Sequence, residues 1–92
     1  MKDGKVDYKP VFGNNFRKIL ERLSRKDKSL VLKIEKQIIR VLKEPTLGKP
    51  LRNILRNQRR VHIDPFVLIY EIHDNEIWFL DFGHHDRIYK KH

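Results

Sequence analysis

The 92-residue sequence contains no cysteine, and none of its apolar runs approaches the roughly 18 residues that span a membrane. The first absence excludes disulfides and thiolate zinc sites, and it suits a reducing compartment. The N-terminal segment Met1–Lys5 is polar and shows no secretory signal. We therefore expect a cytoplasmic protein without a membrane partner. Repeats and linkers are also absent, so residues 1–92 should form one domain.

Acidic residues are scarce: 12 Asp and Glu stand against 21 Lys and Arg, a formal net charge of +9. Between Glu44 and Asp64 there is no acidic residue, but there are five basic ones: Lys49, Arg52, Arg56, Arg59 and Arg60. This excess favours a polyanionic partner, which could be nucleic acid, an anionic membrane or an acidic protein. A solvated basic face is the plainer interpretation, and composition alone does not separate the two.

The first half of the chain predicts a strand and two helices. Val6–Phe12 has the pattern of a strand, and Pro10 places it at a sheet edge. Apolar residues then follow helical spacing from Phe16, and Ser24 is a candidate N-cap for a second helix. Pro45 should end that helix. The two helices should form a hairpin with one apolar and one basic side.

The second half has the shorter period of strands. Asp74-Asn75 is a hairpin turn signal, Gly83 should end the last strand, and the polar residues 84–92 should form a tail. The expected fold is α+β: an N-terminal edge strand, a helical hairpin, then an antiparallel meander of about four strands, with the helices packed on one sheet face. The four expected strands are Leu51–Leu55, Arg59–Ile63, Phe66–Ile72 and Glu76–Phe82.

Three segments, together with this element order, resemble the RelE/ParE toxin superfamily. Each motif is weak alone, but their order and spacing in a short basic chain are specific, and the resemblance covers nearly the whole sequence. The segments are the helix end Leu42–Pro45 followed by Gly48–Leu51, the strand pair Arg60–Ile72, and the C-terminal Gly83–Tyr89.

This resemblance implies the toxic half of a toxin–antitoxin pair. The family's nucleases cleave mRNA in the ribosomal A site through attack of the RNA 2′-hydroxyl on the adjacent phosphate, without a metal or other cofactor. That chemistry requires a base, a proton donor and positive charge on the phosphate. The implied partners are a cognate antitoxin, which would form a hetero-oligomer with the toxin, and the ribosome with its rRNA and mRNA.

The resemblance to the histidine-using, YafQ-like members nominates a catalytic set. His62 and His85 match their histidine positions, Tyr89 matches a C-terminal aromatic, and Arg60 matches a basic strand position of RelE-like members. Strand alternation places Arg60 and His62 on one face. The candidate phosphate and RNA contacts are Lys49, Arg52, Arg56, Arg87 and Lys90.

Each candidate also has a plainer interpretation. His85 could be an exposed tail residue, Tyr89 could pack the tail onto the sheet, and Arg60 with His62 could be an ordinary surface pair. The sequence also departs from the family. Val67 stands where RelE-like members have a catalytic arginine, and Phe66 stands where YafQ-like members have an aspartate.

Two other functions are therefore kept. One is a ParE-like poison of DNA gyrase, which acts by binding and does not need the histidine cluster. The other is an inactive basic nucleic-acid-binding module, which the valine at position 67 favours. A metal site at His84-His85-Asp86 is not expected, because adjacent side chains rarely converge on one ion.

Overall fold

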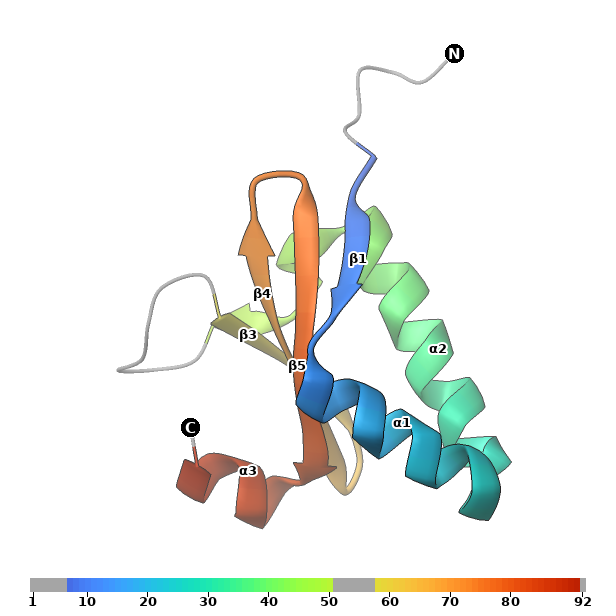
Figure 1. The fold of residues 1–92 in the computed structure, drawn as a ribbon. Coiled ribbons are helices and arrows are strands. Elements are labelled where there is room, and N and C mark those ends of the chain that lie inside the picture. Colours follow the sequence, from blue (N-terminus) through green and yellow to red (C-terminus); the bar gives the residue numbers. More distant parts are fainter. Residues whose placement is uncertain (1–6, 51–57, 92) are drawn as a thin grey trace.

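The computed structural model describes residues 7–50 and 58–91, and five strands within them form one sheet in the order β1-β5-β4-β3-β2. Figure 1 shows the sheet between the α1–α2 hairpin and α3. The elements in chain order are β1 (Lys9–Phe12), α1 (Asn14–Lys26), α2 (Lys28–Lys43), the 3₁₀ helix η1 (Pro45–Leu47), β2 (Lys49–Pro50), β3 (Gln58–Ile63), β4 (Phe66–His73), β5 (Glu76–His84) and α3 (His85–Lys91). The predicted α+β class is confirmed.

The two helices of the predicted hairpin meet at Asp27, not at Ser24. The Asp27 carboxylate accepts a hydrogen bond from the Leu30 backbone N–H at 3.1 Å and so caps α2. The Ser24 hydroxyl instead donates to the Glu21 carbonyl at 2.7 Å, inside α1. The predicted Ser24 cap is wrong because that hydroxyl is satisfied within its own helix, which continues to Lys26.

The main core lies between this hairpin and one face of the sheet. Both elements contribute fully buried side chains, which interlock because the helical and strand periods each present one apolar side. The fully buried members are Phe16, Ile34 and Val41 from the helices and Leu68, Tyr70, Ile77 and Phe79 from the sheet.

The sheet combines both pairing modes. Strand β1 lies at the edge, as Pro10 predicted, and runs parallel to β5, while β5, β4, β3 and β2 pair antiparallel in succession. The first meander strand is β2 at Lys49–Pro50, and the predicted strand Leu51–Leu55 falls outside the described residues.

Strand β5 does not end at Gly83, as predicted, but continues to His84. Gly83 pairs with Val67 across the sheet. A β-carbon at this position would lie 1.8 Å from Arg87 Nη2. Glycine is therefore used here to admit a neighbouring side chain, and it does not break the strand.

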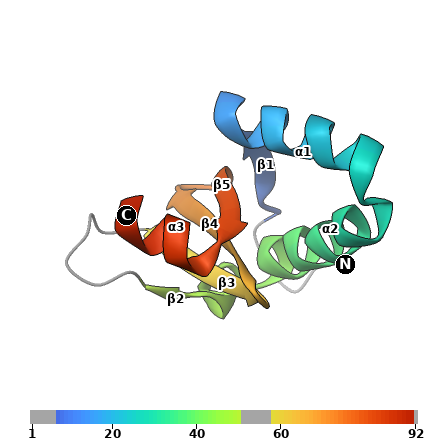
Figure 2. The ribbon, with the colours of Figure 1, turned by 90° about the horizontal axis from the view of Figure 1, so that it is seen from below.

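The predicted polar tail is a helix, α3, and this is the main correction to the fold. Its Ile88 side chain is fully buried against Val67 and Ile69 of β4. Those residues alternate with Leu68 and Tyr70, which face the hairpin, so α3 covers the opposite sheet face (Figure 2). Seven residues with one apolar anchor carry too little periodicity to indicate a helix.

The path from α2 into the sheet is fixed by Tyr70. Its buried hydroxyl donates to the Pro45 carbonyl at 2.5 Å and accepts from the Gly48 N–H at 2.9 Å. Arg59 adds a hydrogen bond to the Gly48 carbonyl at 2.6 Å, as expected for a structural arginine. A β-carbon on Gly48 would lie 2.6 Å from the Arg60 carbonyl. This packing positions β2 beside β3.

No helix in the described ranges, 7–50 and 58–91, is both long and apolar enough to span a bilayer.

Candidate functional site

The candidate site lies on the sheet face that carries α3, where Tyr89 contacts three of its predicted partners. The Tyr89 hydroxyl is 3.1 Å from His62 Nε2. The Arg60 guanidinium carbon is 5.7 Å from the centre of the tyrosine ring, within the range of a cation–π contact. The His85 ring centre is 6.4 Å from the same ring. The structure therefore brings together the four predicted catalytic residues.

Two elements far apart in sequence build this cluster. Arg60 and His62 project from the same face of β3 because strand side chains alternate, and His85 and Tyr89 are four residues apart on α3, which places them on one side of that helix. Tyr89 is 43% exposed, whereas the adjacent Ile88 is fully buried. The buried isoleucine thus anchors the helix and leaves the tyrosine at the surface.

Arg60 is held through one nitrogen of its guanidinium. Its Nη1 donates to the Pro50 carbonyl at 3.3 Å, and its Nε is buried without a hydrogen-bond partner among the described residues, so a phosphate would be met by the Nη groups. A guanidinium carries five N–H donors in a rigid fork that fits phosphate oxygens. Arg60 is therefore suited to hold a phosphate beside the two imidazoles.

A shallow pocket of about 200 Å³ extends the site toward β2 and α2. Arg60 and His62 line it together with Lys49, which lies opposite Arg60 in the β2–β3 ladder. Arg40 of α2 lines it as well, and sequence reasoning did not select that residue. Helical spacing assigned Arg40 to the basic side of the hairpin, but only the tertiary fold shows which basic side chain meets the sheet edge.

The remaining predicted RNA contacts lie in different surroundings. Lys90 is exposed on α3. The Arg87 guanidinium donates to the Phe82 carbonyl at 3.0 Å and lies 3.8 Å from the Asp81 carboxylate, so this side chain ties α3 to β5. Arg52 and Arg56 lie outside the described residues.

The positions that depart from the family are structural in this chain. Val67, the cross-strand partner of His62, is fully buried under Ile88. The ring of Phe66 packs on that of Phe82 with centres 5.3 Å apart. Neither residue carries a polar group into the candidate site, whose polar side chains come from the cluster around Tyr89.

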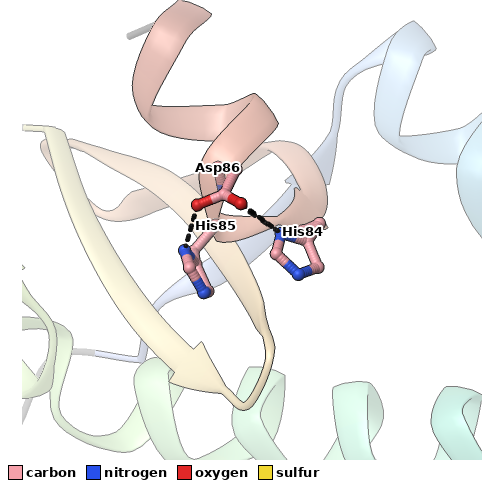
Figure 3. Close-up of side chains that lie close together, drawn as sticks. All are labelled: His84, His85 and Asp86. Carbon is pink, nitrogen blue, oxygen red and sulfur yellow. Dashed lines mark hydrogen bonds and ion pairs between the residues drawn. The ribbon is translucent and has the colours of Figure 1, made fainter.

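Asp86 lies next to His85 at the start of α3, and Figure 3 shows its carboxylate between two imidazoles. One carboxylate oxygen is 3.0 Å from His85 Nδ1, and the other is 3.8 Å from His84 Nδ1. Because Asp86 contacts Nδ1 of His85, it leaves Nε2 as the nitrogen that can exchange a proton with a substrate.

At the far end of strands β3–β5, an acidic side chain takes the place of the basic cluster. Glu71 lies 2.6 Å from His73 Nε2 and accepts a 2.6 Å hydrogen bond from Gln58. Burial alone would raise the pKa of the Glu71 carboxyl, but the Gln58 hydrogen bond and the nearby His73 outweigh it and lower the pKa. The ring of Trp78 packs beside His73.

Comparison with known proteins supports one family. Residues 7–89 match the model of the ParE toxin of type II toxin–antitoxin systems (parDE). The chain is 43% identical over 77 residues to a protein of Methanocaldococcus jannaschii named "Putative toxin RelE4", and the match covers 80% of this chain and 82% of that protein.

Solved structures give the same fold. The toxin–antitoxin complex RelBE2 from Mycobacterium tuberculosis matches with a TM-score of 0.70 and 27% identity, over 90% of this chain and 97% of that one. The Escherichia coli DinJ–YafQ complex matches with a TM-score of 0.70 and 20% identity, over 91% and 99%. The chain therefore belongs to the RelE/ParE superfamily of toxins from type II toxin–antitoxin systems.

Proposed function

We propose that this toxin is a ribosome-dependent endoribonuclease that cleaves translated mRNA in the ribosomal A site and so stops translation in the cytoplasm. The observation that carries the proposal is the set of contacts around Tyr89, which joins His62, His85 and Arg60 in one cluster. Two proton-transfer groups beside a fixed cation are what cleavage at an RNA phosphate requires.

The proposed reaction needs only side chains. The RNA 2′-oxygen attacks the adjacent phosphorus and the bond from phosphorus to the 5′-oxygen breaks, which leaves a 2′,3′-cyclic phosphate. One imidazole of the His62–His85 pair takes the 2′-hydroxyl proton, and the other donates a proton to the leaving 5′-oxygen. Arg60 stabilises the charge that builds on the phosphate, and Tyr89 holds the groups together or stacks on a base.

Basic residues around the cluster would hold the substrate. Lys49 and Arg40 line the pocket next to Arg60, and Lys90 is exposed on α3. Phosphate contacts by such residues supply most of the sequence-independent affinity for nucleic acid. Arg52, Arg56 and Arg87 remain predicted RNA contacts.

The proposal includes an antitoxin partner. RelBE2 and DinJ–YafQ are toxin–antitoxin complexes, and they share this fold. A net charge of +9 suits an acidic, partly disordered partner that wraps the toxin. The toxin would then be stored as an inactive hetero-oligomer.

A gyrase poison is the second candidate, because the matching family model carries the ParE name. Such a toxin acts by binding and gives no reason for two histidines to meet at one tyrosine. The third possibility, an inactive nucleic-acid-binding module, rests on the valine at position 67, where RelE-like members have a catalytic arginine. Val67 is fully buried beneath α3, in a position that an arginine side chain could not fill.

The deciding experiment is induction of the wild type and of His62→Ala and His85→Ala in a bacterial host, with mRNA 5′ ends mapped by primer extension. The matched control is His73→Ala, an exposed histidine of the same sheet that contacts Glu71 and not Tyr89. We expect new, translation-dependent ends with the wild type and the control. Each site variant should reduce the cleavage rate by about 10²–10⁴-fold, the usual contribution of one proton-transfer group.

Other outcomes separate the alternatives. Growth arrest without new ends, unchanged by His85→Ala, would reject the nuclease and favour gyrase or another target. A soluble wild type that causes neither arrest nor cleavage would favour the inactive module.

A further inference from the structure

The cluster formed by His84, His85 and Asp86 has the composition and spacing of a metal site. One ligand atom from each of the three residues lies within 4.8 Å of the others, and this is the only such group of His, Cys, Asp or Glu found within the described part of the chain. Figure 3 shows the two imidazoles on one side of the α3 start, with the carboxylate between them. The centres of the two rings are 4.4 Å apart.

Adjacent histidines can converge here because the backbone changes from strand to helix between them. His84 is the last residue of β5 and His85 is the first residue of α3. Within a strand, neighbouring side chains would point to opposite faces of the sheet. The junction removes that alternation, and the sequence-based argument against a metal site therefore does not hold at this position.

The distances between the possible ligand atoms of this cluster are close to those between two ligands of a tetrahedral ion. With zinc–ligand bonds of about 2.0–2.1 Å, two tetrahedral ligands are separated by about 3.4 Å. Asp86 Oδ1 is 3.0 Å from His85 Nδ1, and the other oxygen, Oδ2, is 3.8 Å from His84 Nδ1. One ligand atom from each of the three residues already lies within 4.8 Å of the others, so rotation of exposed side chains would bring them to tetrahedral spacing.

The protonation pattern and the exposure also suit an ion. His84 Nδ1 accepts a hydrogen bond from the Asp86 backbone N–H at 3.2 Å and is therefore unprotonated, which is the form that binds a metal once the exposed ring turns this lone pair from the amide toward the ion. All three side chains reach solvent, with exposed fractions of 47%, 43% and 74%. Water could therefore supply the remaining ligand.

We propose that His84, His85 and Asp86 bind a divalent transition-metal ion such as zinc, and that the bound ion inhibits the toxin. Two imidazoles and one carboxylate favour zinc, copper or nickel over magnesium or calcium. Inhibition follows because the ion occupies His85, which also belongs to the cluster around Tyr89. The proposal that the ion binds rests on the arrangement of the three residues. The proposal that the bound ion inhibits the toxin, the inhibitory half, rests on the proposed nuclease function.

Binding is tested on tag-free full-length protein, by the visible absorption of bound Co²⁺ and by calorimetric titration with Zn²⁺. We expect one equivalent to bind the wild type. His84→Ala should weaken binding by more than about tenfold, because loss of even an outer-shell partner costs roughly 10–100-fold. Asp86→Asn, which preserves side-chain shape, provides a second test of the site.

Two matched controls address binding elsewhere. His73→Ala removes another exposed histidine paired with a carboxylate, and His92→Ala removes the terminal histidine; both should bind like the wild type. Circular dichroism without metal verifies that each variant is folded. Equal affinity of the wild type and His84→Ala, or no binding at millimolar metal, would overturn the site.

Inhibition is tested by mRNA cleavage on purified ribosomes with and without Zn²⁺. His84→Ala should cleave like the wild type without metal and should resist zinc. If the ion binds and wild-type cleavage continues, the inhibitory half is overturned. If no cleavage occurs under any condition, the nuclease proposal fails, while the Co²⁺ and calorimetric results still decide the metal site.

Discussion

The two faces of the sheet are formed by alternate residues of the same strands, but helices cover them to different degrees. On β4, Leu68 and Tyr70 face a core supplied by two long helices, whereas Val67 and Ile69 are covered chiefly by Ile88 of α3. The first face has enough apolar area to hold the fold. The second holds one short helix, and that helix carries half of the candidate site. The candidate site thus lies on the face that is less completely covered.

Two tyrosines, one in β4 and one in α3, show the same contrast. The Tyr70 hydroxyl is saturated by Pro45 and Gly48, and burial raises the pKa of its phenol. The Tyr89 hydroxyl contacts His62 at the surface. The same functional group therefore stabilises the backbone on one face and is available for substrate on the other.

Ile88→Ala should disturb the α3 face most strongly, because it removes the anchor of α3. Loss of a fully buried isoleucine costs about 2–5 kcal/mol in the free energy of unfolding. Cleavage should also fall, since His85 and Tyr89 would no longer be held against β3. Urea denaturation and ribosome cleavage measure the two effects.

The matched control for this change is Ile39→Ala on α2. That side chain is 54% exposed, so the substitution should change stability by less than about 0.5 kcal/mol and leave cleavage intact. Wild-type stability and cleavage in Ile88→Ala would mean that α3 is held by something other than this contact.

The pair Tyr70→Phe and Tyr89→Phe should separate an effect on stability from an effect on cleavage. Tyr70→Phe leaves the Gly48 N–H and the Pro45 carbonyl without their partner, which should lower stability by about 1–3 kcal/mol while the folded protein still cleaves. Tyr89→Phe should leave stability nearly unchanged and reduce cleavage. Thermal denaturation and single-turnover cleavage of both variants test this, and a reversed pattern would contradict the assignment of roles.

The main elements were predictable because their apolar periods are long. The helices over residues 14–43 and the strands over 58–84 each repeat their pattern for several residues, and the strand alternation alone placed Arg60 and His62 together. The order and the pairing of the meander followed from short turns such as Asp74-Asn75. These features are local, and a single sequence contains them.

What could not be predicted depends on tertiary contacts. Helix α3 forms because Ile88 finds Val67 and Ile69, which are about twenty residues earlier in the chain. The three residues His84, His85 and Asp86 are adjacent in sequence, but their convergence depends on the strand-to-helix junction, which the sequence pattern did not predict. The hydrogen bond from Arg87 to β5 also becomes visible only in the fold, and the RNA contact of Arg87 stays a prediction.

Glu71, which contacts Gln58 and His73 at the far end of β3–β5, should show the weakest of these effects. Its carboxyl has a pKa below the ordinary 4.5 in the folded chain, since the Gln58 hydrogen bond and His73 outweigh desolvation. A depressed carboxyl pKa contributes stability above the unfolded-state value, and this contribution is lost as pH falls through the folded-state pKa. The stability difference between wild type and Glu71→Gln should therefore shrink as pH falls below about 4.5.

Melting temperatures of the wild type and Glu71→Gln between neutral and acidic pH measure this difference. The matched variant is Gln58→Leu, which keeps the carboxyl but removes its 2.6 Å hydrogen-bond donor, and it should show a weaker pH dependence than the wild type. A difference between wild type and Glu71→Gln that stays constant with pH would mean that the carboxylate contributes nothing through its charge. Glu71 would then act only as a polar partner of Gln58 and His73.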